Sequence, residues 1–328
     1  MRIKLLFLAL FLCSTVAGRS IQHLTSIGDF KTTGGEIIRD CKIGYRIMGT
    51  LNATNSNIIL WPTWFSGTSE ALLGVIPKIV DTTRFAVVIA DALGDGVSSS
   101  PSNSKMFPAI TIRDMVRSQY ELLSRQLNIN HVYAVAGISM GGMQTFEWVV
   151  AYPEFMDKAI TIVGTPKQSF YDLLLWHTEL ELINQAENNG NAGEMELIRE
   201  RIADIDLMHL YTPGFFVRTQ TAGDLDTYLK RMYEEKNDLS NLRSQIQAMI
   251  HQDIYKSSGK NFPEIKELIK ARLLIIVSKQ DHMVNPAGAT GFAKQISCEF
   301  LEVDTDCGHD LLACGSEKII EVINSFLK

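Results

Sequence analysis

The chain has 328 residues, of which 46% are hydrophobic and 21% are charged. These values are typical of a globular protein and exclude a disordered one. The length accommodates one large α/β domain with an insertion, or two domains. The formal net charge of -6 indicates no basic surface, so nucleic acid is excluded as an expected partner.

The N-terminal residues have the layout of a secretory signal peptide. Arg2 and Lys4 form a short basic start, an apolar run follows at 5–12, and small residues stand at 16–18. We therefore expect a signal peptide at residues 1–18 and a secreted or periplasmic protein. The apolar run is too short for a permanent bilayer anchor, so no stable membrane insertion is expected. An uncleaved interfacial helix is the alternative.

The first half of the chain alternates between strand and helix patterns. Early antiparallel strands are expected between residues 21 and 50. Buried strands of a parallel sheet follow at 58–61, 85–90, 131–136 and 158–163. Helices are expected at 111–127 and 143–152. This alternation predicts a doubly wound, mostly parallel α/β sheet flanked by helices.

A change of character after this alternation predicts an insertion. Helical patterns without a convincing buried strand occupy 171–186, 193–210, 224–235 and 239–254, with breaks at 188–191 and 212–214. The sheet pattern then returns, with strands at 271–277 and 299–303 and helices at 286–296 and 316–327. We predict a core domain formed by residues 21–168 and 269–328, and an inserted helical cap, or lid, at 169–268.

A glycine-rich motif lies between a predicted strand and a predicted helix. Residues 137–142 are Gly-Ile-Ser-Met-Gly-Gly, a G-x-S-x-G pattern. In this context the pattern is typical of a nucleophile elbow, in which a tight turn lifts a serine hydroxyl clear of the sheet. Glycines beside the serine let neighbouring backbone pass close by. Ser139 is therefore the predicted nucleophile; an ordinary glycine-rich turn is the alternative.

The predicted nucleophile needs a base and an acid. A serine hydroxyl is activated by a group that takes its proton, and that group is oriented by a carboxylate. Asp281 follows one late strand and His309 follows the last, so both are expected at the carboxyl edge of the sheet with Ser139. The order Ser, Asp, His is that of an α/β-hydrolase. Asp304 and Asp306 lie too near His309 in sequence to be the acid.

Acyl transfer also requires hydrogen-bond donors for the developing oxyanion. One is expected to be the backbone N–H of Met140, which follows the nucleophile. The second is expected in the loop after the 58–61 strand, at Phe65, with Trp64 as the alternative. We expect the Trp64 side chain to contact substrate; core packing of the aromatic side chains is the alternative.

Cysteines bracket the predicted base. Four cysteines follow the predicted signal peptide, namely Cys41, Cys298, Cys307 and Cys314. An exported protein meets an oxidising compartment, where disulfides persist. A bridge between Cys307 and Cys314 would close a short loop around His309, and a pair of unpaired thiols is the alternative.

Three motifs resemble the homoserine O-acetyltransferase family of α/β-hydrolases. They are Thr-Ile-Arg-Asp-Met-Val-Arg-Ser-Gln at 111–119, Ser-Met-Gly-Gly-Met-Gln-Thr-Phe-Glu-Trp at 139–148, and Gly-His-Asp at 308–310. The resemblance implies the triad, an acyl-serine intermediate and a helical lid over a tunnel. It also implies that Asp310 faces the amino group of an acceptor. The chain differs at Ile138, where the family usually has glycine, and after Gly164, so homoserine specificity is not implied.

These observations predict a secreted serine hydrolase that cleaves an ester or related acyl substrate through an acyl-enzyme. The alternative is an O-acyltransferase that moves an acyl group to an alcohol, with acyl-CoA as co-substrate. A non-enzymatic binding protein of the same fold is the third hypothesis. No cofactor and no metal are expected, and the expected partner is a small-molecule acyl ester or acyl donor. The oligomeric state is left open, a homodimer included.

Overall fold

The computed structural model describes residues 20–189, 191–234, 237–314 and 316–328. The predicted signal peptide at residues 1–18 lies outside this part of the chain. Within it, no helix combines the length and the apolar character that crossing a membrane requires.

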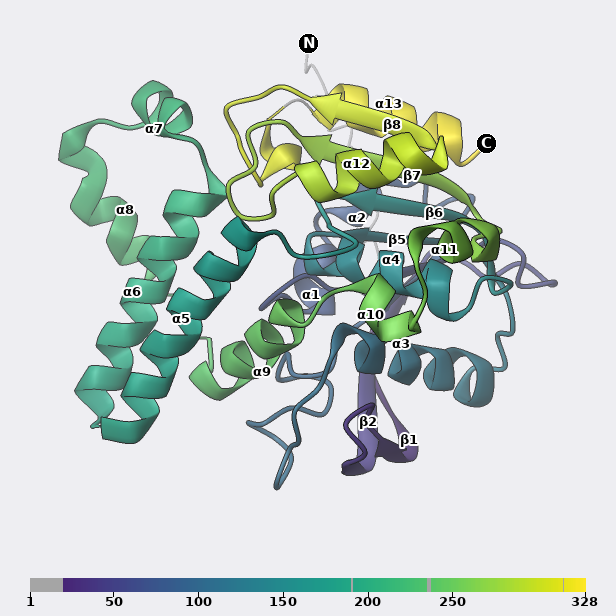
Figure 1. Cartoon of the computed structure of the whole chain (residues 1–328), viewed down its shortest axis with the longest axis horizontal. Helices are drawn as coiled ribbons and strands as arrows, with labels where there is room; N and C mark the ends of the chain where they lie inside the picture. The colour runs from purple at the N-terminus through teal and green to yellow at the C-terminus, as the bar shows by residue number, and fades with distance from the viewer. Residues whose placement is uncertain (1–19, 190, 235–236, 315) are drawn as a thin grey trace, which may run out of the picture.

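One eight-stranded sheet runs through the described residues, in the order β1-β2-β4-β3-β5-β6-β7-β8 (Figure 1). The first two strands form an antiparallel hairpin, and β2 pairs antiparallel with β4. All neighbours from β4 to β8 are parallel. The strands are β1 (His23–Lys31), β2 (Ile37–Met48), β3 (Ile58–Pro62), β4 (Ala86–Ala90), β5 (Val132–Ile138), β6 (Met156–Ile162), β7 (Arg272–Ser278) and β8 (Glu299–Val303). The predicted fold class, a mostly parallel α/β sheet, is confirmed.

Helices bury both faces of this sheet. Neighbouring side chains of β3 enter different hydrophobic clusters, Ile58 and Leu60 on one face and Ile59 and Trp61 on the other. Side chains alternate across a strand, so a strand covered on both faces is apolar throughout, as the sequence pattern indicated. One face carries α1 (Ser69–Leu72), α2 (Ile76–Ile79) and α13 (Ser316–Phe326), and the other carries α3 (Ile112–Glu121), α4 (Met140–Ala151) and α12 (Ala287–Ile296).

The helix expected at 111–127 ends earlier than the pattern indicated. Regular α-helix stops at Glu121, and the π-helical turn Leu122–Gln126 follows. Leu122 and Leu123 are both fully buried in this turn. Adjacent positions of a regular helix point in different directions, so the wider turn accompanies the burial of both leucines.

The segment between β6 and β7 is helical, with no named strand among its described residues. It contains α5 (Phe170–Asn189), α6 (Ala192–Leu210), α7 (Pro213–Thr219), α8 (Leu225–Met232), α9 (Leu239–Ile250), α10 (Ile254–Ser258) and α11 (Phe262–Leu268), with a 3-10 turn at Ala222–Asp224. Figure 1 shows α5 to α8 projecting to one side of the sheet, whereas α10 and α11 lie against the core. The part that stands apart from the core is therefore shorter than the whole insertion.

Two helix boundaries in this segment differ from the sequence interpretation. Residues 212–214 were expected to be a break, but Pro213 begins α7, and the Thr212 hydroxyl accepts a hydrogen bond from Phe215 N at 3.2 Å. Proline fits the first helical turn because its missing N–H has no helical acceptor there. The helix expected at 239–254 ends at Ile250, and Asp253 caps the separate helix α10.

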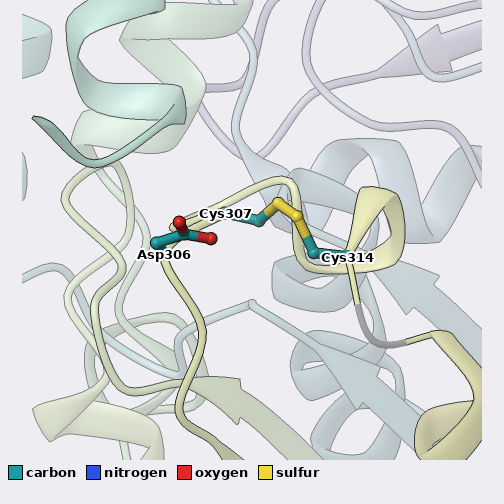
Figure 2. Close-up of side chains that lie close together, drawn as sticks. All are labelled: Asp306, Cys307 and Cys314. Carbon is teal, nitrogen blue, oxygen red and sulfur yellow. A yellow bond between two sulfur atoms is a disulfide. The ribbon is translucent and has the colours of Figure 1, made fainter. Parts of the chain in front are cut away.

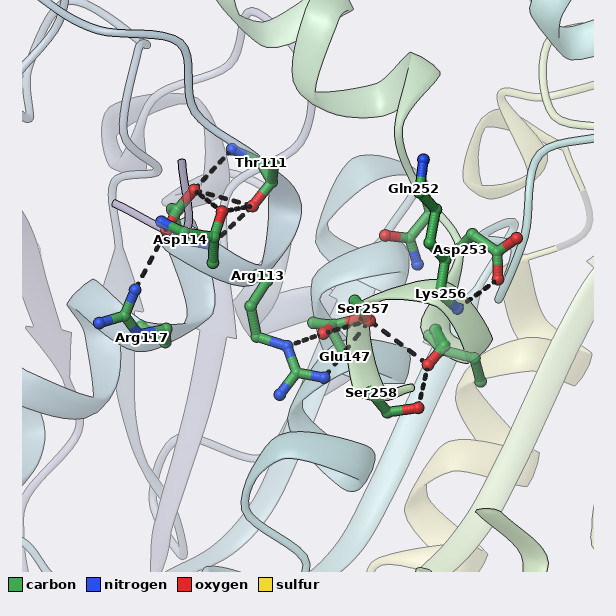
Figure 3. Close-up of polar contacts among 12 residues, drawn as sticks. Thr111, Arg113, Asp114, Arg117, Glu147, Gln252, Asp253, Lys256, Ser257 and Ser258 are labelled. Atoms are coloured by element: carbon green, nitrogen blue, oxygen red, sulfur yellow. Dashed lines mark hydrogen bonds and ion pairs between the residues drawn. The ribbon is translucent and has the colours of Figure 1, made fainter. Parts of the chain in front are cut away.

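The conspicuous motif at 111–119 holds helices of the core together (Figure 3). Thr111 and Asp114 form a capping box at the start of α3, and Asp114 also accepts a hydrogen bond from Thr33 N at 2.7 Å. Arg113 forms an ion pair with the buried Glu147 of α4. The motif thus anchors the N-terminal hairpin and α4 to α3.

Helix α10 joins this ion pair. The Ser257 hydroxyl donates to a carboxylate oxygen of Glu147 at 2.9 Å. Burial raises the pKa of Glu147, and the positive charge of Arg113 opposes that shift. The carboxylate therefore depends on its partners to stay ionised in the interior.

We expect Arg113→Met to lower the free energy of unfolding by about 3–5 kcal/mol at pH 7, because it leaves the Glu147 carboxylate buried and unpaired. The loss should shrink as pH falls, since protonation of Glu147 removes the unpaired charge. Urea unfolding at pH 7 and pH 5.5 measures both effects. Arg125→Met is the control, since Arg125 pairs with Glu121 at the surface, where such pairs contribute only about 0.5 kcal/mol. Equal losses in the two variants would contradict the role of the buried pair.

Candidate active site

Ser139 occupies a strained turn between β5 and α4. Its backbone has φ 56° and ψ -121°, a positive φ that residues with a Cβ rarely adopt. The Ser139 N–H donates to the carbonyl of Ile162, at the end of β6, at 2.8 Å. The serine therefore stands at the carboxyl edge of the sheet in an energetically costly conformation, which is typical of a functional position.

The glycines around Ser139 are required by close backbone contacts. A Cβ on Gly137 would lie 2.1 Å from the carbonyl oxygen of Gly141, and a Cβ on Gly141 would lie 2.6 Å from that of Pro62. Gly142 and Gly164 face each other, and a Cβ on Gly164 would lie 2.8 Å from the Gly142 Cα. The start of α4 consequently packs directly on the ends of β3 and β6.

The structure brings Ser139, His309 and Asp281 together in one hydrogen-bonded chain. The Nδ1 of His309 lies 2.7 Å from Asp281 Oδ2, and its Nε2 lies 2.8 Å from Ser139 Oγ. A carboxylate only accepts hydrogen bonds, so Nδ1–H is the donor to Asp281. The Nε2 of a neutral imidazole is then free to accept the Ser139 proton.

Backbone amides fix the Asp281 carboxylate. Its Oδ1 accepts from the N–H of Met283 at 2.9 Å and from that of Val284 at 2.8 Å. Its Oδ2 remains for His309. The loop after β7 therefore holds the carboxylate in one orientation toward the imidazole.

Asp172 is a buried neighbour of this chain that the sequence analysis missed. It lies at the start of α5, where it accepts from Ser169 N at 2.8 Å, and its other oxygen accepts from Asn285 N at 2.8 Å. It links the base of the lid to the loop that carries Asp281. The Ser-x-x-Asp spacing of a capping box at 169–172 was the available sequence signal.

Carboxylates dominate the electrostatics of His309. Burial by itself lowers the pKa of His309, but the charges of Asp281, Asp310 and Asp172 and the hydrogen bond to Asp281 outweigh it. The net result is a His309 pKa above its ordinary value of 6.5. These carboxylates therefore stabilise a positive charge on the imidazole.

The lid holds the loop that carries His309. The N–H of His309 donates to the carbonyl of Leu210 at 2.8 Å, and the Tyr211 hydroxyl donates to Asp310 Oδ2 at 2.6 Å. Arg218 forms two hydrogen bonds with Asp306, at 2.7 and 2.8 Å. Asp310, expected to contact an acceptor amine, thus has one oxygen engaged by the lid, and its substrate-binding role stays a prediction.

A disulfide closes the loop that carries His309 (Figure 2). Cys307 and Cys314 are bonded, with Cα atoms 5.9 Å apart, and the 3-10 turn Leu311–Ala313 lies between them. Cys41 and Cys298 are free. Together with Asp306, the bonded pair forms a cluster of metal-ligand types, but its sulfurs are bonded to each other and Asp306 pairs with Arg218.

The predicted oxyanion donors lie on two different elements, the start of α4 and the loop after β3. Met140 is the first residue of α4, where helix N–H groups lack a helical acceptor. The N–H of Phe65 has no acceptor among the described groups, and its neighbour Ser66 N donates to Gln245 Oε1 at 2.9 Å. The Trp64 indole packs against Gly67 and the core. The roles of Met140, Phe65 and Trp64 stay predictions.

With this geometry established, comparison with known proteins identifies the family. A family model described as the alpha/beta hydrolase fold matches residues 58–313. The chain belongs to the α/β-hydrolase family.

Relatives of two kinds are similar to this α/β-hydrolase. Ethyl acetate hydrolase of Pseudomonas veronii is 28% identical over 88% of this chain and 88% of its own. Homoserine O-acetyltransferase of Methanosalsum zhilinae is 27% identical over 91% of this chain and 71% of its own. The crystal structure of an acetylester hydrolase from Corynebacterium glutamicum matches with a TM-score of 0.85, 25% identity, and coverage of 94% and 95%. The chain is therefore an enzyme, a hydrolase or an acyltransferase, and the predicted resemblance to the acetyltransferase family is confirmed.

The motif at residues 139–148 of this α/β-hydrolase supports the loop that carries Phe65. The Gln144 side chain donates to the carbonyl of Thr63 at 3.0 Å, and the Gln119 side chain donates to Gln144 Oε1 at 2.6 Å. The Trp148 indole donates to Gln119 Oε1 at 2.9 Å. This buried network joins α3 and α4 to the loop after β3, an arrangement that the sequence alone did not reveal.

We expect Gln144→Leu to lower kcat for a short ester about tenfold with little change in KM, because the loop that carries the Phe65 N–H loses its support. Steady-state kinetics measures this split. Gln295→Leu is the control, since Gln295 is exposed on α12. An unchanged kcat in Gln144→Leu would contradict a positioning role for the network.

Proposed function

We propose that this enzyme is a carboxylic ester hydrolase in which Ser139, His309 and Asp281 act as nucleophile, base and acid. The observation that carries the proposal is the continuous hydrogen-bonded chain from Asp281 through His309 to Ser139. The strained turn and the carboxylates that raise the His309 pKa support it. Three groups from separate loops in the order Ser, Asp, His are typical of acyl-enzyme chemistry.

In the first half of the reaction, Ser139 Oγ attacks the ester carbonyl carbon and its proton passes to His309 Nε2. The carbonyl oxygen becomes an oxyanion, which accepts hydrogen bonds from the N–H groups of Met140 and Phe65. The carbon–oxygen bond to the alcohol then breaks. The proton on His309 transfers to the departing oxygen, and an acyl-serine remains.

In the second half, a water molecule gives its proton to His309 Nε2 and attacks the acyl-serine carbonyl. The bond to Ser139 Oγ breaks, and the serine regains the proton from His309. A carboxylic acid leaves. Asp281 stays ionised and hydrogen-bonded to His309 Nδ1 throughout, which stabilises the imidazolium in both halves.

Water is the proposed acceptor because a relative that matches over 88% of both chains is named for hydrolysing ethyl acetate. A short acetyl ester is therefore the proposed substrate. The second candidate is acyl transfer from acyl-CoA to an alcohol such as homoserine, which the homoserine O-acetyltransferase relative favours. The two differ only in the molecule that attacks the acyl-serine.

The deciding experiment follows the acyl group. The purified protein is incubated with ethyl acetate, and separately with acetyl-CoA with and without homoserine. Release of acetate from ethyl acetate supports hydrolysis. Formation of an acetylated homoserine without ester hydrolysis would replace hydrolysis by the transfer reaction.

We also propose that the protein is exported. The signal-like residues 1–18 support this, as does a disulfide in the loop of His309, because disulfides persist in oxidising compartments. Mass analysis of protein from the culture medium or periplasm tests export, and full-length protein confined to the cytoplasm would contradict it.

We expect Ser139→Ala to lower kcat by about 10⁴-fold, because no other group supplies the nucleophile. Ester hydrolysis and labelling by a fluorophosphonate both measure the loss, and circular dichroism checks the fold. Ser325→Ala, at an exposed serine of α13, is the matched control. Turnover near the native value in Ser139→Ala would overturn the assignment.

We expect kcat/KM to fall on the acid side with a midpoint above pH 6.5. His309 accepts a proton only when it is neutral, and its pKa is raised, so activity is lost as pH falls through that raised value. The profile is measured with phenyl acetate, which does not titrate. A midpoint below 6.5, or a flat profile between pH 5 and 8, would contradict a histidine base in this setting.

A further inference from the structure

Two lid helices bring buried carboxyl groups together near His309. Glu179 lies on α5 and has no exposed surface, and Asp206 lies on the facing helix α6. Their side chains are within hydrogen-bonding reach of each other. Both oxygens of Glu179 and Oδ1 of Asp206 are buried, and none of the described N–H or hydroxyl groups donates to them. Buried polar atoms are normally satisfied, so this group lacks donors.

Asp206 is the more accessible member of the pair. Part of its surface is exposed, whereas Glu179 is fully buried. A ligand therefore reaches the pair from the side of Asp206. Asp206 lies one helical turn before Leu210, whose carbonyl accepts the His309 N–H, and the charge of His309 acts on the Asp206 carboxyl. The Asp206 carboxyl therefore lies near the imidazole.

A second unpaired group lies on the same face of α5. Trp176 is 1% exposed, and its indole N–H has no partner. Asp172, Trp176 and Glu179 follow helical spacing, so they share one stripe of α5. Asp172 contacts the Asp281 loop, and Trp176 packs edge-on against Phe65 at 5.7 Å between ring centres. This stripe leads from the reacting groups to the carboxyl pair.

The charged groups that raise the pKa of His309 are carboxylates, namely Asp281, Asp310 and Asp172. Burial raises the pKa of Asp206 to about 7, and burial and Asp206 together raise that of Glu179. Bringing carboxyl groups together in the interior is unfavourable unless a proton or a cation lies between them. A positively charged hydrogen-bond donor supplies both the missing hydrogen bonds and the opposite charge.

We propose that Glu179 and Asp206 bind a protonated amine on the alcohol portion of the ester substrate. This inference rests on the proposed ester hydrolysis. The alcohol oxygen leaves with the proton of His309 Nε2, so the alcohol portion lies on the imidazole side of the site, where Asp206 lies. An ammonium N–H donates to the carboxyl pair, and its charge balances theirs.

The test uses two acetate esters of the same shape. 2-(Dimethylamino)ethyl acetate carries a protonated amine at neutral pH, and 3-methylbutyl acetate replaces the nitrogen with carbon. The ratio of their kcat/KM values is measured for the wild type, Glu179→Gln, Asp206→Asn and the control Glu181→Gln, which is exposed on α5. The intrinsic reactivity of each ester is the same for every variant, so a change in the ratio reports recognition of the charge.

We expect the ratio to fall at least about tenfold in Glu179→Gln and Asp206→Asn, the effect of losing a charged hydrogen bond, and to stay unchanged in Glu181→Gln. Hydrolysis of the neutral ester should persist in all variants. In the wild type, 2-(dimethylamino)ethanol should inhibit hydrolysis of the neutral ester competitively, a measurement that requires no variant to fold.

Other outcomes separate the two proposals. A ratio that is the same in all four proteins would overturn the amine site while leaving ester hydrolysis intact, and would mean that the carboxyl pair only shares a proton. Failure to hydrolyse either ester, with phenyl acetate still cleaved, would also overturn the amine site alone. Failure to hydrolyse any ester would overturn the proposed function itself.

Discussion

The turn at Ser139 is the constraint on which the site depends. The residue has φ 56°, and the helix that follows starts within contact of Pro62 and Gly164. Such close packing leaves no room for a Cβ at the flanking glycines, and it holds a strained backbone that isolated peptide would not adopt. Because β3, β5, β6, β7 and β8 are parallel, their carboxyl ends meet at one edge. Residues that are far apart in the sequence therefore lie close to Ser139.

The helical insertion between β6 and β7 helps to position His309. Backbone and side chains at 210–218 hold the loop at 306–310 through the Leu210 carbonyl, the Tyr211 hydroxyl and the Arg218 guanidinium. The disulfide restrains the far end of the same loop. His309 is thus held by the core, the lid and a covalent bond together. Changes in the lid are expected to alter the reacting geometry as well as the substrate preference, since small displacements of a catalytic group have large effects on rate.

The interior beside His309 is unusually rich in carboxyl groups. Asp281 and Asp172 are satisfied by backbone N–H groups, whereas Glu179 and one oxygen of Asp206 are not. Satisfied carboxylates orient their neighbours and stabilise positive charge on the imidazole. Unsatisfied ones are costly to the folded state, and functional sites are where proteins most often retain such groups. The two kinds of carboxylate near His309 therefore have different physical roles.

Periodicity and local motifs in the sequence were sufficient for the order of strands and helices along the chain, the tight turn at Ser139, and the places of Asp281 and His309. These features depend on side-chain alternation and on glycine at a tight turn. Pro213 was interpreted as a break, although Thr followed by Pro is also a local start signal for a helix, and the Thr212 side chain does cap α7. Other features required the tertiary structure. Three sets of contacts join residues on different elements. They are the hydrogen bonds among Gln119, Gln144 and Thr63, the hydrogen bond from Tyr211 to Asp310, and the pairing of Glu179 with Asp206. No local pattern records such contacts, since they arise only when helices from distant parts of the chain pack against each other.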